Sequence, residues 1–338
     1  TGASNTAVGT SALATNTTSA GNTAVGYNAG TVNTGYENVF LGAYTGEANT
    51  SGYYNTAVGG VTLATNSSGH SNTAIGRRAM DANTTASANT AIGVKALYAN
   101  TTGDENVAVG NDSLKVSTTS SKNTAVGFEC MQANTTGHSN VAVGYKSLWT
   151  SVGETQCAAL GYKALYASNN GRCVAVGYGA GWSITTGFNN TVVGTSVAQD
   201  LTTGDNNTII GYGADAPDAD SNNTVTFGNG SIDNLRCNDT SISSLSDERD
   251  KTNIEDLALG VDFLNTVRPV SFDWDRRDGT FAGYKGLGFI AQELKVAGDA
   301  TDFADHMRLV HTDNPDLLEA DPMKMFPILV KAIQELST

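Results

Sequence analysis

The stretch NTAVG at residues 22–26 decides the fold, because close variants of it recur along most of the chain. NTAVG stands again at residues 55–59, and NTAIG stands at residues 72–76. Each closing glycine is followed by the next after 17 residues in eleven cases and after 16 residues in two. A period this constant predicts a solenoid in which each repeat is one coil stacked on the last. The closing glycines are Gly9, Gly26, Gly42, Gly59, Gly76, Gly93, Gly110, Gly127, Gly144, Gly161, Gly177, Gly194, Gly211 and Gly228.

Each repeat predicts a short β-strand that ends at its glycine. In residues 22–26, alternation places Thr23 and Val25 on one face of the strand and Asn22 and Ala24 on the other. The glycine then permits a bend that a residue with a Cβ atom would resist. The predicted fold is therefore mainly β, a parallel β-solenoid of 14 coils of about 17 residues, with a small α+β domain after it.

Both faces of the predicted strand are chemically restricted. The residue before the closing glycine is always Val, Ile, Leu or Phe, and the residue before that is Ala in ten of fourteen coils. A coil with so few apolar residues has little surface to bury by itself. We therefore expect the alanine face to pack against other copies of the chain and to build a homotrimer.

Charge density changes sharply near residue 246. The formal net charge is −14, and residues 246–338 hold 28 of the 52 charged side chains. This change predicts a repetitive shaft over residues 1–230, a connector over 231–245 and a second domain over 246–338. The acidic balance argues against nucleic acid as a partner. No apolar run reaches the ~18 residues of a membrane helix, and so we expect no membrane insertion.

No metal or cofactor site is predicted. The four cysteines lack the C-x-x-C spacing of a zinc or redox site, and we expect free thiols. Because the chain begins with Thr1 rather than Met, we expect it to be the C-terminal part of a longer protein. Five histidines and aspartates near the C-terminus are expected to be solvated loop positions rather than metal ligands: His306, His311, Asp313, Asp316 and Asp321.

Tyrosines recur directly after the closing glycine, among them Tyr145, Tyr162 and Tyr178. A ladder of aromatic rings can stack on sugar rings, and it can equally cover the corner of each coil. The sequence leaves both roles open. Acidic residues are scattered singly through the turns, and so the paired carboxylates of a glycoside hydrolase are not visible.

The two parts of the chain resemble two known families. The repeats resemble the head repeats of trimeric autotransporter adhesins, which implies a left-handed parallel β-roll in a trimer. The second part contains, in order, SDERDKTNI, GVDFLNTVRPVSFDW, GLGFIAQEL and MFPILVKAIQEL. These blocks resemble the peptidase S74 domain, the intramolecular chaperone at the C-terminus of phage endosialidases, tailspikes and tail fibres.

The second resemblance implies trimer assembly followed by a single self-cleavage of each chain. Carried over to this sequence, Ser246 is the nucleophile, Lys251 is its base, and the bond between Leu245 and Ser246 is cut. Asp247 and Arg249 are supporting residues of the same motif. A lysine becomes a base only when burial or a nearby cation favours its neutral form. The Arg249 charge would favour that form, whereas the Asp247 charge would oppose it.

Together these features predict a phage tail fibre or tailspike. In this hypothesis a trimeric solenoid serves host attachment, and the fibre is assembled in the host cytoplasm and carried on the virion. Two alternatives stay open. The second domain could be a non-cleaving trimerisation cap on a glycan-binding, adhesin-like solenoid, or the chain could be a tailspike that depolymerises capsule.

Overall fold

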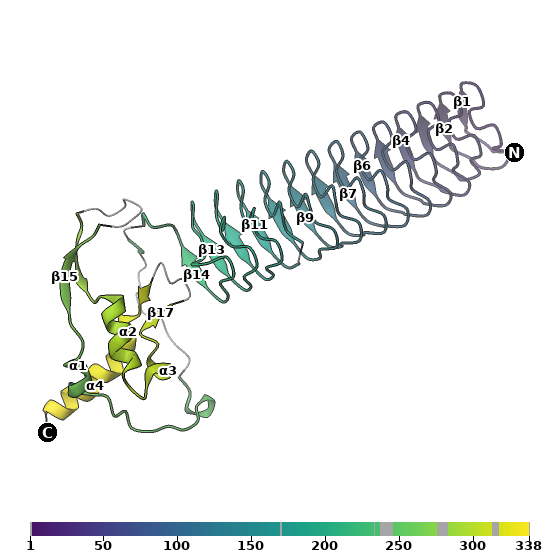
Figure 1. The fold of residues 1–338 in the computed structure, drawn as a ribbon. Coiled ribbons are helices and arrows are strands. Elements are labelled where there is room, and N and C mark those ends of the chain that lie inside the picture. Colours follow the sequence, from purple (N-terminus) through teal and green to yellow (C-terminus); the bar gives the residue numbers. More distant parts are fainter. Residues whose placement is uncertain are drawn as a thin grey trace. The chain divides into compact units, whose positions relative to one another are not determined.

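The computed structural model describes residues 2–169, 171–232, 234–236, 246–275, 283–312 and 318–337. It divides into two compact units, Thr1–Asn229 and Gly230–Thr338 (Figure 1). The first unit contains fourteen strands of three residues, one in each coil. They are β1 (Thr6–Val8), β2 (Thr23–Val25), β3 (Val39–Leu41), β4 (Thr56–Val58), β5 (Thr73–Ile75), β6 (Thr90–Ile92), β7 (Val107–Val109), β8 (Thr124–Val126), β9 (Val141–Val143), β10 (Ala158–Leu160), β11 (Val174–Val176), β12 (Thr191–Val193), β13 (Thr208–Ile210) and β14 (Val225–Phe227).

The first unit is a parallel β-solenoid, which confirms the predicted fold (Figure 1). Every strand pairs in parallel with the strands of the coils before and after it, in the chain order β1 to β14. Residues at the same place in the repeat lie opposite each other, as Val107 does to Thr124 and Val109 does to Val126. Because one repeat makes one rung, the repeat period of the sequence sets the register of the whole sheet.

The interior of the solenoid is filled by the alanine face of the strands. Ala24, Ala91 and Ala142 are completely buried within the single chain, while the flanking Thr and Val side chains point outward. The expectation that the alanine face packs against other copies is therefore wrong. The coil is so narrow that an alanine under the strand and a leucine from the opposite wall, such as Leu97, already fill it.

A ladder of buried asparagines runs along the same interior. The Asn106 Nδ2 atom donates to the Asn89 Oδ1 atom at 3.1 Å and to the Ser120 carbonyl at 2.8 Å. The Asn106 Oδ1 atom in turn accepts the backbone N–H of Asn123 at 3.0 Å. Each asparagine thus satisfies backbone groups that the turns of a thin coil would otherwise bury without a partner.

Where a strand alanine is replaced by a larger residue, smaller residues stand at the neighbouring wall positions. Phe40 replaces the strand alanine of β3 and is completely buried. The wall position that holds Leu13 and Leu63 is glycine in the two coils nearest this ring, at Gly30 and Gly46. A Cβ atom at Gly46 would lie 2.3 Å from the Phe40 ring, and one at Gly30 would lie 2.7 Å from it. One phenylalanine therefore takes the space of two leucines.

The closing glycine of each coil is required for two reasons, its backbone conformation and its close contact with the next coil. Gly127 has φ +141°, and a Cβ atom there would lie 2.2 Å from the carbonyl oxygen of Gly144 in the next coil. A side chain would be strained by the backbone and would also collide with the next rung. The recurrence of glycine at a fixed period is therefore a packing requirement of close stacking.

The second unit consists of short helices and two small antiparallel sheets. Strands β15 and β16 form one sheet, and β17 and β18 form the other. In chain order the elements are η1 (Glu248–Asp250), α1 (Val261–Leu264), β15 (Val270–Asp273), β16 (Lys285–Gly288), α2 (Ala291–Asp299), α3 (Ala304–Met307), β17 (Val310–His311), β18 (Glu319–Ala320), η2 (Pro322–Met325) and α4 (Phe326–Leu336).

A small core joins α1, α2 and α4. Phe263, Leu294 and Ile328 are buried together with Met307, Leu309 and Met325. The Glu335 carboxylate of α4 accepts the backbone N–H of Val261 at 2.9 Å and so caps the start of α1. α1 is a single turn, and the glycine at its N-cap, Gly260, is a poor helix former that favours no extension toward residue 257.

Candidate functional site

The motif at residues 246–251 folds into one tight turn. Asp247 caps η1, and its carboxylate accepts the backbone N–H of Arg249 at 2.9 Å. Lys251 ends the helix, and its own N–H donates to the Glu248 carbonyl. An aspartate at an N-cap stabilises the orphan donors of the first turn. This turn brings Ser246 and Lys251, five residues apart, to one place.

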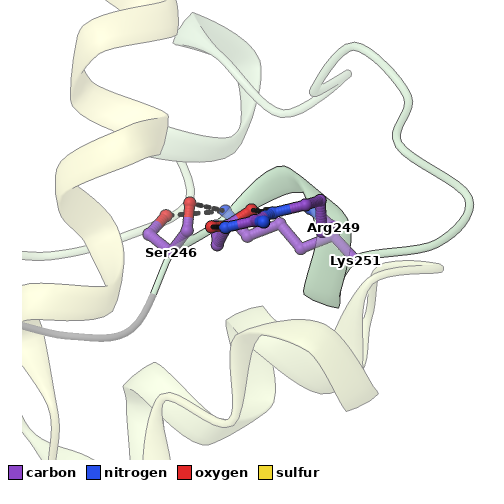
Figure 2. A network of polar contacts seen from close by, with 4 residues as sticks. Ser246, Arg249 and Lys251 are labelled. Carbon is purple, nitrogen blue, oxygen red and sulfur yellow. Dashed lines mark hydrogen bonds and ion pairs between the residues drawn. The ribbon is translucent and has the colours of Figure 1, made fainter.

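Ser246 and Lys251 are in direct contact, as Figure 2 shows. The Lys251 Nζ atom lies 2.6 Å from the Ser246 Oγ atom and 3.3 Å from the Ser246 carbonyl oxygen. Both side chains are exposed in the single chain. In this hydrogen bond the Lys251 ammonium group is the donor, and the Ser246 hydroxyl oxygen is the acceptor. For Lys251 to act as a base it must lose that proton, and the hydrogen bond must reverse direction.

Arg249 and Asp247 pair with each other beside the Ser246 and Lys251 contact. The guanidinium meets the carboxylate through two bonds, Nε to Oδ1 at 3.0 Å and Nη2 to Oδ2 at 2.6 Å. This pairing lowers the pKa of Asp247 and raises that of Arg249. Each charge is thus balanced by the other, and the pair holds the turn in shape.

Comparison with protein families matches residues 246–307 to the Peptidase S74 family, described as the chaperone of endosialidase. Residues 246–307 form a chaperone-of-endosialidase domain. The match begins at Ser246 itself, the serine that contacts Lys251. The S74 domain therefore follows the solenoid in the chain and carries the motif at its first residues. A search of curated protein sequences found no significant match to the chain.

The S74 domain and the helix that follows it expose large apolar side chains. On the β15–β16 sheet Leu287 is 86% exposed, and Tyr284 precedes it with a half-exposed ring. The apolar side chains of α4 divide between two faces of the helix. Ile328 and Ala332 face the core, whereas Leu329, Ile333 and Leu336 are exposed.

Aromatic rings of the solenoid form two columns across neighbouring coils. In the first column Phe128, Tyr145, Tyr162 and Tyr178 stack with centroid spacings of 5.6, 5.1 and 4.8 Å and planes within 8°. The structure thus brings the three tyrosines that the sequence singled out into one column. A second column contains Trp149, Tyr166 and Trp182.

Two lysines lie between the aromatic columns. The Lys163 Nζ atom is 4.1 Å from the Trp182 ring centroid and 5.5 Å from that of Tyr162. Lys146 makes the same kind of contact with Trp149 and also pairs with Glu129 at 3.1 Å. A lysine ammonium group over the face of an aromatic ring is attracted to that ring electrostatically. The two lysines and the aromatic columns therefore stabilise one another. Sequence spacing showed the tyrosine column but did not reveal the tryptophans beside it.

The outward face of the strands is a continuous apolar strip. Its last position in each strand is Val, Ile, Leu or Phe, and examples such as Val143, Ile92 and Val176 are each 38% exposed. A row of partly exposed apolar side chains along fourteen strands is the kind of surface that marks an interaction site.

Within the described ranges there is no group of three His, Cys, Asp or Glu residues that could hold a metal ion. Of the histidines and aspartates considered from the sequence, Asp313 and Asp316 lie outside the described residues. Cys130, Cys157 and Cys173 are buried, and the described residues contain no disulfide; Cys237 lies outside them. In the same part of the chain, no helix is long and apolar enough to cross a bilayer.

Proposed function

We propose that this chain is a phage tail fibre or tailspike, in which a trimeric β-solenoid serves host attachment and the C-terminal domain drives trimerisation and then cuts itself off. The proposed parts are a shaft over residues 1–230, a connector over 231–245 and a chaperone over 246–338. The observation that carries the proposal is the S74 match, which begins at a serine 2.6 Å from the Lys251 amine. S74 domains of this type are associated with trimerisation.

The proposed cleavage uses the contact between Ser246 and Lys251. The Ser246 Oγ atom attacks the carbonyl carbon of Leu245, and its proton passes to the Lys251 Nζ atom. The bond from that carbon to the Ser246 nitrogen breaks, and the nitrogen takes the proton to become a free amine. Water then hydrolyses the new ester, which leaves a Leu245 carboxylate and restores the Ser246 hydroxyl. Leu245 itself lies outside the described residues.

Trimer assembly would control this reaction. In the single chain the Lys251 side chain is exposed to water. Burial of Lys251 against neighbouring chains would favour the neutral amine that a base requires. Assembly would then switch on the cleavage, so that the chaperone leaves only after its work is done.

The outward strand strip is the proposed contact between the three shafts. It replaces the alanine face, which the structure uses inside the coil. The exposed side chains of α4, Leu329, Ile333 and Leu336, offer a second contact, at the spacing of a helix bundle. Burial of both surfaces removes apolar area from water and so stabilises the trimer.

A fibre of this kind needs a device that sets its register. One coil resembles the next, and a slip of one coil between chains costs little in any single contact. A domain that trimerises at the end of the chain aligns the three chains before the coils pair. Its removal would then make the shaft kinetically resistant to unfolding, because the aligning element is gone.

Denaturing and native mass spectrometry test the proposal. Wild type should split between Leu245 and Ser246 and form trimers, whereas Ser246→Ala and Lys251→Met should stay whole as trimers. Ser271→Ala, which changes an exposed serine in β15, should cleave like wild type. If wild type stays whole although it is trimeric, the domain is a retained trimerisation cap and the roles of Ser246 and Lys251 are refuted.

Host attachment through glycans is a second proposal, favoured by the aromatic column. Its exposed edges carry the phenol groups of Tyr145, Tyr162 and Tyr178 in a regular row. Binding of the full chain to glycan arrays and to a panel of bacterial cells tests this role. Release of reducing sugars from capsule would instead support depolymerisation, for which the sequence offers no carboxylate pair.

A further inference from the structure

The first aromatic column is interrupted at Thr195. Strand register places Val176 opposite Val193 and Val193 opposite Ile210, and so the residues two positions later also stack. Backbone bonds continue this register, because Ser196 N–H donates to the Tyr178 carbonyl at 2.8 Å and Gly213 N–H donates to the Thr195 carbonyl at 3.0 Å. The order along the column is therefore Tyr178, Thr195 and Tyr212.

Within the part of the chain that the structure describes, each of the two tyrosines beside the interruption has a ring face that no other aromatic ring covers. Tyr145 and Tyr162 are sandwiched between neighbours and are 39% and 37% exposed. Tyr178 is stacked on one side alone and is 55% exposed, and Tyr212 is 73% exposed. The covered rings offer a ligand only their edges. At the interruption, by contrast, a ligand can stack on the exposed ring faces of Tyr178 and Tyr212.

The spacing at the interruption suits one further ring. Adjacent rings of the column are 4.8 to 5.6 Å apart, and two rungs of a parallel sheet are separated by about 9.6 Å. A ring placed midway would therefore sit about 4.8 Å from each tyrosine. Thr195 is exposed, its side chain is too short to take the place of a ring, and its hydroxyl is a hydrogen-bonding group on the rung between the two tyrosines.

We propose that Tyr178 and Tyr212 sandwich a gluco-configured pyranose ring over Thr195. This proposal deepens the glycan attachment proposed above and rests on it. A β-glucopyranose carries all its substituents equatorially, and so both of its faces present axial C–H groups. The positive edges of C–H bonds are attracted to the negative face of an aromatic ring. A galacto- or manno-configured sugar has an axial hydroxyl on one face, which prevents close stacking on one of the two tyrosines.

The chemistry of the position favours a sugar over an aromatic side chain of a partner protein. Each of the two exposed tyrosines carries a phenol hydroxyl at the edge of its ring, and Thr195 adds a third hydroxyl on the rung between them. A sugar has apolar faces and a rim of hydroxyls, which matches this arrangement on every side. A phenyl ring would stack equally well but would leave the rim unused.

The proposal is tested with methyl β-D-glucopyranoside and methyl β-D-galactopyranoside, added to the full chain in saturation-transfer NMR titrations. The glucoside should bind, and the galactoside should bind roughly two- to tenfold more weakly, because one stacked face is lost. Thr195→Tyr should abolish binding, since a tyrosine at this position completes the column. Six other coils have an aromatic residue there, which indicates that the variant folds. Thr195→Ser is the matched control and should bind like wild type.

Several results would overturn the proposal. These are absence of glucoside binding, equal binding of both sugars, and binding that survives Thr195→Tyr in a chain with unchanged thermal stability. Thr195-dependent binding of N-acetyl-tyrosine amide without binding of the glucoside would show an aromatic partner instead. Attachment of the chain to bacterial cells is measured in parallel. If cells are bound and neither sugar is, the proposed subsite fails while host attachment stands.

Discussion

Replacement of Asn106 by alanine should open the solenoid locally. The Asn106 side chain is buried and serves the Ser120 carbonyl and the Asn123 backbone N–H, at 2.8 and 3.0 Å. Alanine at this position would leave the Ser120 carbonyl and the Asn123 N–H without these hydrogen bonds and would offer them no replacement. An unsatisfied buried polar group costs about 1–3 kcal/mol, and so the two groups together cost about 2–6 kcal/mol. In a solenoid this cost falls on the coils beside the change.

Hydrogen exchange read residue by residue is the suitable assay, because a long array of repeats need not unfold in one reversible step. The lower bound of about 2 kcal/mol corresponds to a roughly thirtyfold faster exchange of the Asn123 amide. Amides several coils away, such as that of Thr208, should exchange as in wild type. Asn111→Ala, which changes a partly exposed asparagine after the same strand, is the control and should leave the Asn123 amide protected. Equal exchange in the two variants would refute the role given to the asparagine ladder.

Three further predictions concern the stacking, the thiols and the trimer. Gly127→Ala should prevent correct folding, because a Cβ atom there meets the next coil at 2.2 Å, whereas Gly60→Ala should express and melt like wild type, because its Cβ atom meets nothing nearer than 4.0 Å. Burial raises the pKa of Cys130 and of Cys157 to about 12 from an ordinary 9.0. Iodoacetamide should therefore label these thiols at pH 8.5 only after denaturation, and the free energy of unfolding should fall as pH rises from 9 toward 12, because the folded state holds the thiol protons more tightly. Labelling of the folded chain would show that the thiols are accessible. Val143→Asp should weaken trimers in native mass spectrometry while circular dichroism stays unchanged, and an undisturbed trimer would exclude the outward strip as the interface.

The period of the glycines was sufficient to predict the strands and their register. Each strand ends at the residue before a closing glycine, as β8 ends at Val126 before Gly127. The prediction succeeded because glycine at this corner is required by a backbone contact, and such contacts leave a strict sequence signal.

Other features leave no such signal. Lys146 and Leu148 adopt left-handed backbone angles, φ 52° and φ 49°, although neither residue type indicates them. The direction of the alanine face was also hidden, because alternation shows that two faces differ but not which one faces inward. The side of the strand that is buried depends on the width of the coil, and that width is set by turns whose conformation the residue types do not show.

The contact between Ser246 and Lys251 was predicted only through a family resemblance. Nothing in the spacing of a serine and a lysine five residues apart requires them to touch. The Asp247 cap and its pairing with Arg249 make the turn that joins them. The aromatic interruption at Thr195 could be read from the sequence only after the column itself was known to stack.

The pairing of Phe40 with two glycines bears on how such a solenoid changes length during evolution. A shaft of near-identical coils lends itself to gain or loss of whole repeats by recombination. The coils that carry Gly30, Phe40 and Gly46 cannot be exchanged one at a time, because a leucine returned to either glycine position would collide with the ring. Between Gly93 and Gly144, where alanine and leucine or methionine recur without exception, a coil can be added or removed with its neighbours intact. Length variation among related solenoids should therefore concentrate in that central stretch, and the coils around Phe40 should be inherited as a block.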